Sequence, residues 1–244
     1  MGTKARLKFL NRAARFDGDI EFVDVIYSAV LHGDLTPSAD HPLFLHVEAA
    51  AHPRLSSQKI SEGNRNHVVG HLRKSVYASY VKDLYEDFSE YLAEIVNVAR
   101  KGFTPRRIAA GHKVTLDANE ILDCGSWEGV LDLVTESVFD RLGSMSNTQR
   151  ITQLLDDVLG LNLDGAIVSA AQPYVELRHL LVHADGVATP EFCSTFPGFG
   201  AYENETVKLT SATVRDARAA VTALVEHIDA RAIAAGLVVV DDMQ

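Results

Sequence analysis

The sequence predicts a mostly α-helical protein, an antiparallel helical bundle with little β-structure. Apolar residues recur every three or four positions over about residues 64–100, which is the spacing of one face of a long helix. Residues 127–142 and 211–235 show the same spacing, and only 206–209 suggest a short strand. With 244 residues, 47% of them apolar, the chain is long enough to bury a sizeable core.

The first helix is expected to start at a cap formed by Asp17 or Asp19. It is expected to end near Leu31, because Gly33 follows as a stop. Apolar residues lie on nearly all sides of this helix, which predicts that it is buried. A short helix is expected over residues 43–51, ahead of the long helix.

The long helix carries the strongest pattern in the chain, and Gly102 is expected to end it. Its apolar stripe comprises Val69, Leu72, Val76, Tyr80, Leu84, Phe88, Leu92 and Ile95. A loop then leads to the helix over 127–142. Ser146 and Gln149 have the spacing of a capping box, which predicts a further helix to about Leu159.

The last part of the chain is expected to contain the remaining helices. Asp164 opens a helical stretch that contains a proline, so we expect a break before Pro173 and a new helix from there to Ala184. Residues 189–204 hold several prolines and glycines and are expected to form a loop. The final helix is expected over 211–235.

We expect three segments, namely an N-terminal helical extension (1–60), a helical bundle (61–235) and a tail (236–244). The two cysteines, Cys124 and Cys193, form no CxxC pair, so neither a disulfide framework nor a thiolate zinc site is predicted. No apolar run reaches the roughly 18 residues of a membrane span, and no signal-peptide pattern is present. A protein of the reducing cytoplasm, with no membrane contact, is therefore expected.

The charge of the chain is unevenly distributed. Its net charge of −10 disfavours general nucleic-acid binding, because phosphate contacts need Lys and Arg. Residues 1–16 and 100–116 are nevertheless basic and contain no acid. Each of these two segments is either a phosphate-facing patch or a solvated face or tail.

One predicted helix ends in the sequence ELRHLLVHADG. At 100° per residue, Glu176, His179 and His183 fall on one arc of this helix, whereas Arg178 projects between apolar residues. A guanidinium in apolar surroundings is costly unless it is paired or ligated. Arg178 is therefore expected either to pair with a carboxylate, such as Glu176 or Asp185, or to face a pocket for an anion.

The two histidines of this helix also allow two interpretations. They form a polar helix face, or they chelate a metal ion, since His179 and His183 lie one turn apart. No carboxylate or cysteine completes a ligand set at motif spacing, so no metal and no cofactor are expected. The sequence contains no phosphate-binding loop, dinucleotide fingerprint or nucleophile elbow.

The order Arg178, the polar His179, three apolar residues and His183 resembles the Rx4–6H signature of the HEPN superfamily. The continuation Ala184-Asp185-Gly186 is similar to HEPN branches whose motif helix ends in such a turn, and the RiboL-PSP-HEPN group looks most similar. The resemblance covers about residues 60–235, and the predicted helix order agrees with a helical bundle of HEPN type.

The resemblance implies a metal-independent endoribonuclease of toxin or phage-defence type that acts as a homodimer. The RNA 2′-hydroxyl would attack the adjacent phosphorus at a composite site. Arg178 would stabilise the phosphate, His183 would transfer protons, and His179 would assist. From the helical wheel, Glu176 is expected to orient His183.

Two further implications concern partners and alternatives. The basic residues Arg106, Arg107 and Lys113 are candidate RNA contacts. HEPN toxins silenced by nucleotidylation carry a tyrosine two residues past the histidine, but this chain has Asp185 there. That departure puts a nucleotidyltransferase antitoxin in doubt, and an antitoxin or other regulatory partner stays an expectation. The alternative is a non-catalytic HEPN module for dimerisation or for binding a nucleotide or partner protein.

Overall fold

The computed structural model describes residues 2–35, 47–58, 61–102, 115–143, 155–156 and 159–244. This part of the chain is mostly helical, as predicted. The helices are α1 (Lys4–His32), α2 (Pro53–Ser56), α3 (Glu62–Gly102), α5 (Ala118–Asp123), α6 (Trp127–Gly143), α8 (Gly165–His183), α9 (Pro190–Thr195), η1 (Pro197–Phe199), α10 (Ser211–Ala234) and η2 (Val240–Asp242). Among the described residues, β-type pairing is limited to two isolated bridges, Thr3 with Met243 and Val187 with Thr206.

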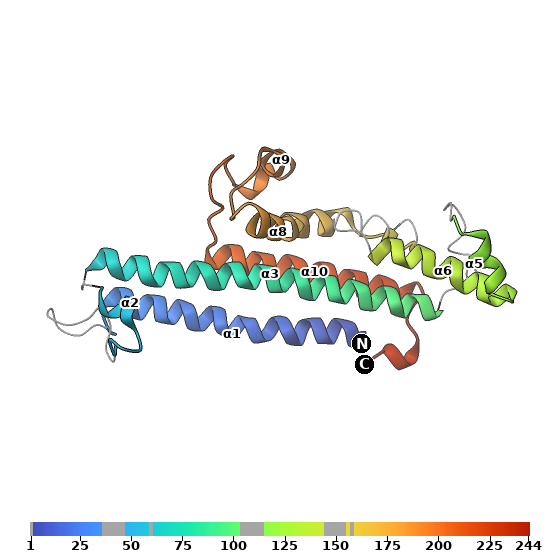
Figure 1. The fold of residues 1–244 in the computed structure, drawn as a ribbon, viewed down its shortest axis with the longest axis horizontal. Helices are drawn as coiled ribbons and strands as arrows, with labels where there is room; N and C mark the ends of the chain where they lie inside the picture. Colours follow the sequence, from blue (N-terminus) through green and yellow to red (C-terminus); the bar gives the residue numbers. More distant parts are fainter. Residues whose placement is uncertain (1, 36–46, 59–60, 103–114, 144–154, 157–158) are drawn as a thin grey trace.

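Four long helices, α1, α3, α8 and α10, lie side by side and form the bundle (Figure 1). Helix α1 runs antiparallel to α3, and α8 runs antiparallel to α10 (Figure 1). Helices α5 and α6 lie at one end of this bundle, and α9 lies above α8. The packing explains why the strongest sequence pattern belongs to α3, since this helix contacts α1, α8 and α10.

Helix α1 begins much earlier than predicted, which makes the expected start at Asp17 or Asp19 wrong. The hydroxyl of Thr3 caps the helix by accepting the backbone N–H of Arg6 at 3.0 Å. The predicted end is confirmed, because Gly33 adopts a left-handed conformation (φ 85°) that stops the helix.

Helix α1 is not buried on all sides, so that prediction is also wrong. Ile20, Val23 and Val30 are buried, but Phe22 is 67% exposed and Val25 is 64% exposed. The reason is that α1 lies on the outside of the bundle and can bury only the face that contacts α3 and α10.

Helix α3 confirms the predicted long helix as far as Gly102, and residues 103–114 lie outside the described part of the chain. Six residues of the predicted stripe are buried, namely Val69, Tyr80, Leu84, Phe88, Leu92 and Ile95. Leu72, however, is 47% exposed. Helix α6 likewise confirms the helix predicted from Trp127.

Helix α8 is continuous, so the predicted break before Pro173 is wrong. Asp164 caps the helix by accepting the N–H of Ala166 at 2.8 Å, as expected. Pro173 lies inside the helix and supplies no N–H for the hydrogen bond to the preceding turn. Val175 and Leu177 are buried after the proline, and α8 packs against both α3 and α10.

Three smaller predictions have other outcomes. The loop expected over 189–204 contains α9 and η1, because Thr189 caps α9 at the N–H of Phe192 (3.2 Å). The strand expected over 206–209 is reduced to the single bridge at Thr206. Of the short helix expected over 43–51, residues 47–51 are not helical and the rest lies outside the described residues.

Two other helix predictions concern the second half of the chain. The helix expected from Ser146 to Leu159 lies mostly outside the described residues. The final helix is confirmed as α10, which begins after a capping box between Thr210 and Thr213.

The chain ends meet at one end of the bundle (Figure 1). The backbone of Gly2 pairs with that of Gln244, and the buried Leu237 packs in the core. Helix α1 shares one continuous core with α3 and α10. The division into an extension, a bundle and a tail stays a prediction. No helix in the described residues is long and apolar enough to cross a membrane.

Candidate functional site

The candidate site lies at the end of α8, where the backbone turns sharply. The N–H groups of Ala184 and Gly186 both donate to the carbonyl of Leu180, at 3.0 and 2.9 Å. Asp185 (φ 49°) and Gly186 (φ 78°) adopt left-handed conformations, which is how many helices are terminated. This turn leaves the Asp185 side chain exposed at the helix end.

Arg178 extends from α8 onto α3. Its Nη2 atom donates to Glu86 Oε1 at 2.8 Å, and its guanidinium carbon lies 4.8 Å from the centre of the Tyr85 ring. Of the two sequence interpretations, pairing with a carboxylate is therefore observed. The partner is neither Glu176 nor Asp185 but Glu86 of the neighbouring helix.

The pairing of Arg178 is incomplete. Its Nε atom is buried and has no hydrogen-bond partner within the described residues. Its side chain is 27% exposed, whereas the Glu86 side chain is 60% exposed. The cation thus sits at the edge of the α3–α8 contact, with its partner carboxylate largely in solvent.

His179 and His183 form an exposed pair on the outer face of α8. Their ring centres are 4.6 Å apart with an angle of 49° between the ring planes. The adjacent Val182 is 42% exposed. No group of three or more metal-ligating side chains occurs in the described part of the chain, and the pair by itself does not complete a metal site.

Glu176 is half-buried and lies one turn before His179 and two turns before His183. Burial raises the pKa of its carboxyl above the ordinary value, and the negative charge of Glu191 on α9 raises that pKa further. His179 acts in the opposite direction and lowers the pKa of Glu176. Of the two motif histidines, His179 is thus the one that affects the pKa of Glu176. The expected orientation of His183 by Glu176 stays a prediction.

Replacement of Glu176 by glutamine is expected to stabilise the protein at neutral pH. The raised pKa of Glu176 means that ionisation disfavours the folded state, and this cost disappears as pH falls and the carboxyl takes up a proton. Glu176→Gln should therefore melt at a higher temperature than wild type at pH 7. The two proteins should converge near pH 4, about the ordinary pKa of Glu. Thermal unfolding followed by circular dichroism at both pH values tests this, and equal melting at pH 7 contradicts it.

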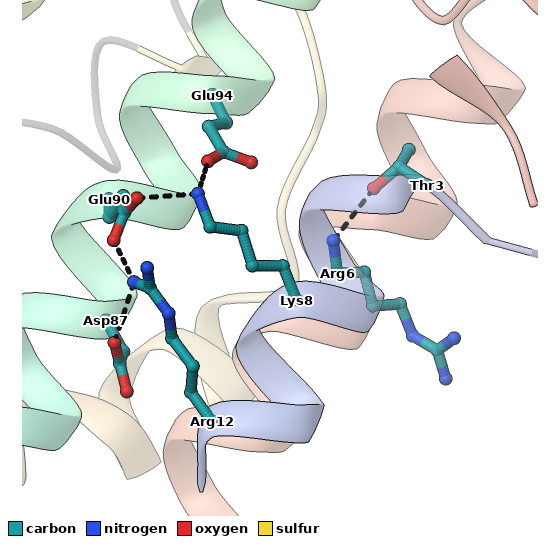
Figure 2. Close-up of polar contacts among 7 residues, drawn as sticks. All are labelled: Thr3, Arg6, Lys8, Arg12, Asp87, Glu90 and Glu94. Atoms are coloured by element: carbon teal, nitrogen blue, oxygen red, sulfur yellow. Dashed lines mark hydrogen bonds and ion pairs between the residues drawn. The ribbon is translucent and has the colours of Figure 1, made fainter. Parts of the chain in front are cut away.

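The first basic segment pairs three of its cations, Arg6, Lys8 and Arg12, with carboxylates of the bundle. It lies on α1, where Lys8 donates to Glu90 at 2.6 Å and also to Glu94 (Figure 2). Arg12 contacts Asp87 at 3.1 Å and also Glu90 (Figure 2).

These ion pairs lower the pKa of Glu90, because both cations favour its charged form. Arg6 at the start of the same helix binds Glu226 of α10 at 2.7 Å. The positive charges of Arg6, Lys8 and Arg12 are therefore paired with acidic residues of the bundle. The second basic segment, with Arg106, Arg107 and Lys113, lies outside the described residues.

The motif residues do not all face one place. Arg178 and His183 are five residues apart, so at 100° per residue they project about 140° apart around α8. The partners Tyr85 and Glu86 were missed from sequence, because they interrupt no pattern of α3 and carry no motif.

Comparisons with models of known families, with curated proteins and with solved structures find no match to this chain.

Proposed function

We propose that this protein is a metal-independent endoribonuclease of toxin or defence type, which works as a homodimer of HEPN type. The observation that carries the proposal is the exposed histidine pair, His179 and His183, on the same helix end as the incompletely paired cation of Arg178. Imidazole, which titrates near neutral pH, is suited to proton transfer, and guanidinium is suited to binding phosphate oxygens.

The reaction needs no group beyond these side chains. A neutral imidazole of His183 accepts the proton of an RNA 2′-hydroxyl, and the 2′-oxygen forms a bond to the adjacent phosphorus. The bond from phosphorus to the 5′-oxygen breaks, and that oxygen takes up a proton from water. The products are a 2′,3′-cyclic phosphate and a 5′-hydroxyl. Arg178 stabilises the charge that develops on the phosphate oxygens.

A second copy of the chain supplies what one copy lacks. Because Arg178 and His183 diverge by about 140° around α8, one chain does not aim both at the same phosphate. Two α8 helices brought together by their exposed outer faces would place His183 of each copy near the site of the other. The exposed Val182 beside the histidines offers apolar surface for that contact.

Arg178 can exchange its partner for a phosphate. An ion pair between partly exposed side chains contributes at most about 1 kcal/mol, so release of Glu86 costs little. A phosphate offers the guanidinium stronger, two-point hydrogen bonding, and the Nε atom that has no partner becomes one of its donors.

The same ion pair favours a second candidate function. With its charge neutralised by Glu86 and stacked on Tyr85, Arg178 is also suited to a structural role between α3 and α8. The protein would then be a non-catalytic HEPN module that dimerises or binds a nucleotide or a regulatory partner, such as an antitoxin.

Cleavage of RNA in the presence of EDTA separates the two functions. Purified wild-type protein is expected to cleave RNA and to leave 2′,3′-cyclic phosphate ends, and His183→Ala should lower the rate at least about a hundredfold. His67→Ala, which removes an equally exposed histidine from α3, is the matched control and should retain the rate. Loss of cleavage in EDTA, or equal rates for the two variants, contradicts the proposal.

A further inference from the structure

An apolar groove runs along the outside of the bundle between α1 and α3, away from the motif on α8. Its volume is about 470 Å³. On α1 it is lined by Phe16, Asp19, Ile20, Phe22, Val23 and Ile26. On α3 it is lined by Leu72, Ser75, Val76, Ser79, Tyr80 and Asp83.

The apolar part of the groove is open to solvent. Phe22 is 67% exposed and Leu72 is 47% exposed. Large apolar side chains gathered on one surface cost free energy in water unless a partner covers them. A covering partner would therefore gain apolar burial from both helices at once.

The groove has an acidic half and an apolar half. The ring centres of Phe16 and Tyr80 lie 6.0 Å apart, which places these two residues opposite each other on the antiparallel helices α1 and α3. In that register Asp19 and Asp83 lie in the half near Phe16, whereas Leu72 lies in the other half.

Among the described residues, neither the carboxylate of Asp19 nor that of Asp83 takes part in a hydrogen bond or an ion pair, in contrast to their neighbour Asp17. Within the described residues, Asp17 contacts Arg218 at 3.5 Å and accepts from the Tyr80 hydroxyl at 3.4 Å. Burial raises the pKa of Asp83, the nearby Glu86 raises that pKa further, and Lys82 acts in the opposite direction. A positively charged group would complement this half of the groove.

We propose that this groove binds an amphipathic helix of a partner protein, with Lys or Arg toward one end of the helix's apolar stripe. The lining of α3 spans residues 72–83, which is about 17 Å or three helical turns. Leu72, Val76 and Tyr80 recur at the spacing that a docked helix uses for its own anchors. The cationic end of the partner would meet Asp19 and Asp83.

Other occupants fit this surface less well. An extended peptide that adds to a sheet edge needs free backbone groups, but the backbone on both sides of the groove is hydrogen-bonded within helices. An anionic membrane surface would be repelled by the two carboxylates. Ser75 and Ser79 are small and one turn apart, so a helix can approach α3 closely between the larger side chains.

Binding of designed helical peptides tests the proposal. The probe is a fluorescent four-turn peptide with leucines at helical spacing and two lysines at the N-terminal end of its apolar stripe. Two comparison peptides carry glutamates in place of the lysines or a scrambled order. Fluorescence anisotropy with the full chain should show the lysine peptide binding at least about tenfold more tightly than either comparison peptide.

Variants of the chain locate the binding. Phe22→Ser and Leu72→Ser should each weaken binding of the lysine peptide about tenfold. Leu122→Ser, which changes a 77% exposed leucine on α5, is the matched control and should not weaken it. The double variant Asp19→Asn, Asp83→Asn should weaken binding of the lysine peptide about fivefold. It should not weaken binding of the glutamate peptide.

Three outcomes overturn the proposal. One is equal binding of the lysine and scrambled peptides, and another is equal binding of the lysine and glutamate peptides. The third is a dimer in sedimentation experiments that Phe22→Ser dissociates, because the groove would then be covered by a second copy. Failure of RNA cleavage leaves this proposal unaffected, since none of its residues belongs to the motif on α8.

Discussion

Replacement of Arg178 by alanine is expected to lower the rate of RNA cleavage about 100- to 1,000-fold, which is the usual effect of removing one charged or polar group that stabilises a transition state. The same change should have little effect on stability. Glu86 is 60% exposed and stays hydrated after its partner is lost, so the cost of the broken ion pair is at most about 1 kcal/mol. Cleavage rates and thermal unfolding of the same preparations measure both effects.

Glu86→Gln is the matched variant for this experiment. It removes the ion pair but leaves the guanidinium of Arg178 in place over Tyr85. If Arg178 binds phosphate, Glu86→Gln should retain or raise the cleavage rate, because the competing carboxylate is gone. If Arg178 only joins α3 to α8, the two variants should be equally active and equally destabilised, which contradicts a catalytic role.

Replacement of Asp229 by alanine is expected to lower the free energy of unfolding by about 3 kcal/mol. Asp229 is 2% exposed on α10 and accepts the backbone N–H of Thr3 at 3.1 Å. It also accepts the hydroxyl of Thr3, which is 1% exposed. Without the carboxylate, two buried donors lose their acceptor, and each unsatisfied buried group costs about 1–3 kcal/mol. Urea unfolding followed by circular dichroism measures the loss.

Two further variants give this prediction its controls. Asp132→Ala removes an exposed carboxylate from α6 and should change the free energy of unfolding by less than about 0.5 kcal/mol. Asp229→Asn keeps an acceptor for the Thr3 N–H. Its free energy of unfolding should therefore lie between those of Asp229→Ala and Asp132→Ala. An Asp229→Ala protein as stable as Asp132→Ala would mean that the junction of the N-terminus with α10 contributes nothing to stability.

The helical elements followed from the sequence wherever a local rule decided them. The spacing of apolar residues predicted α3 because a helix that contacts three neighbours must be apolar along one broad face. Asp164 marked one helix start, since a capping side chain satisfies N–H groups only two or three residues away. Gly33 and Gly186 marked two ends because a left-handed residue favours glycine.

The sequence rules failed where distant residues decided the outcome. The start of α1 was missed because its cap, Thr3, is held in place by Asp229, 226 residues away. The basic segment looked available for phosphate, but Lys8 lies against carboxylates of α3. The break predicted before Pro173 was also wrong, since α8 packs against α3 and α10 and continues through the proline.

The sequence by itself determined the helical class of this protein and the motif on α8, because helix periodicity and residue spacing are local properties. Only the tertiary structure decided that Arg178 pairs with Glu86, that His179 and His183 face solvent, and that an acidic, apolar groove opens between α1 and α3. These features depend on which helices meet and in which register. Contacts between segments far apart in the chain set that register, and no local pattern encodes it.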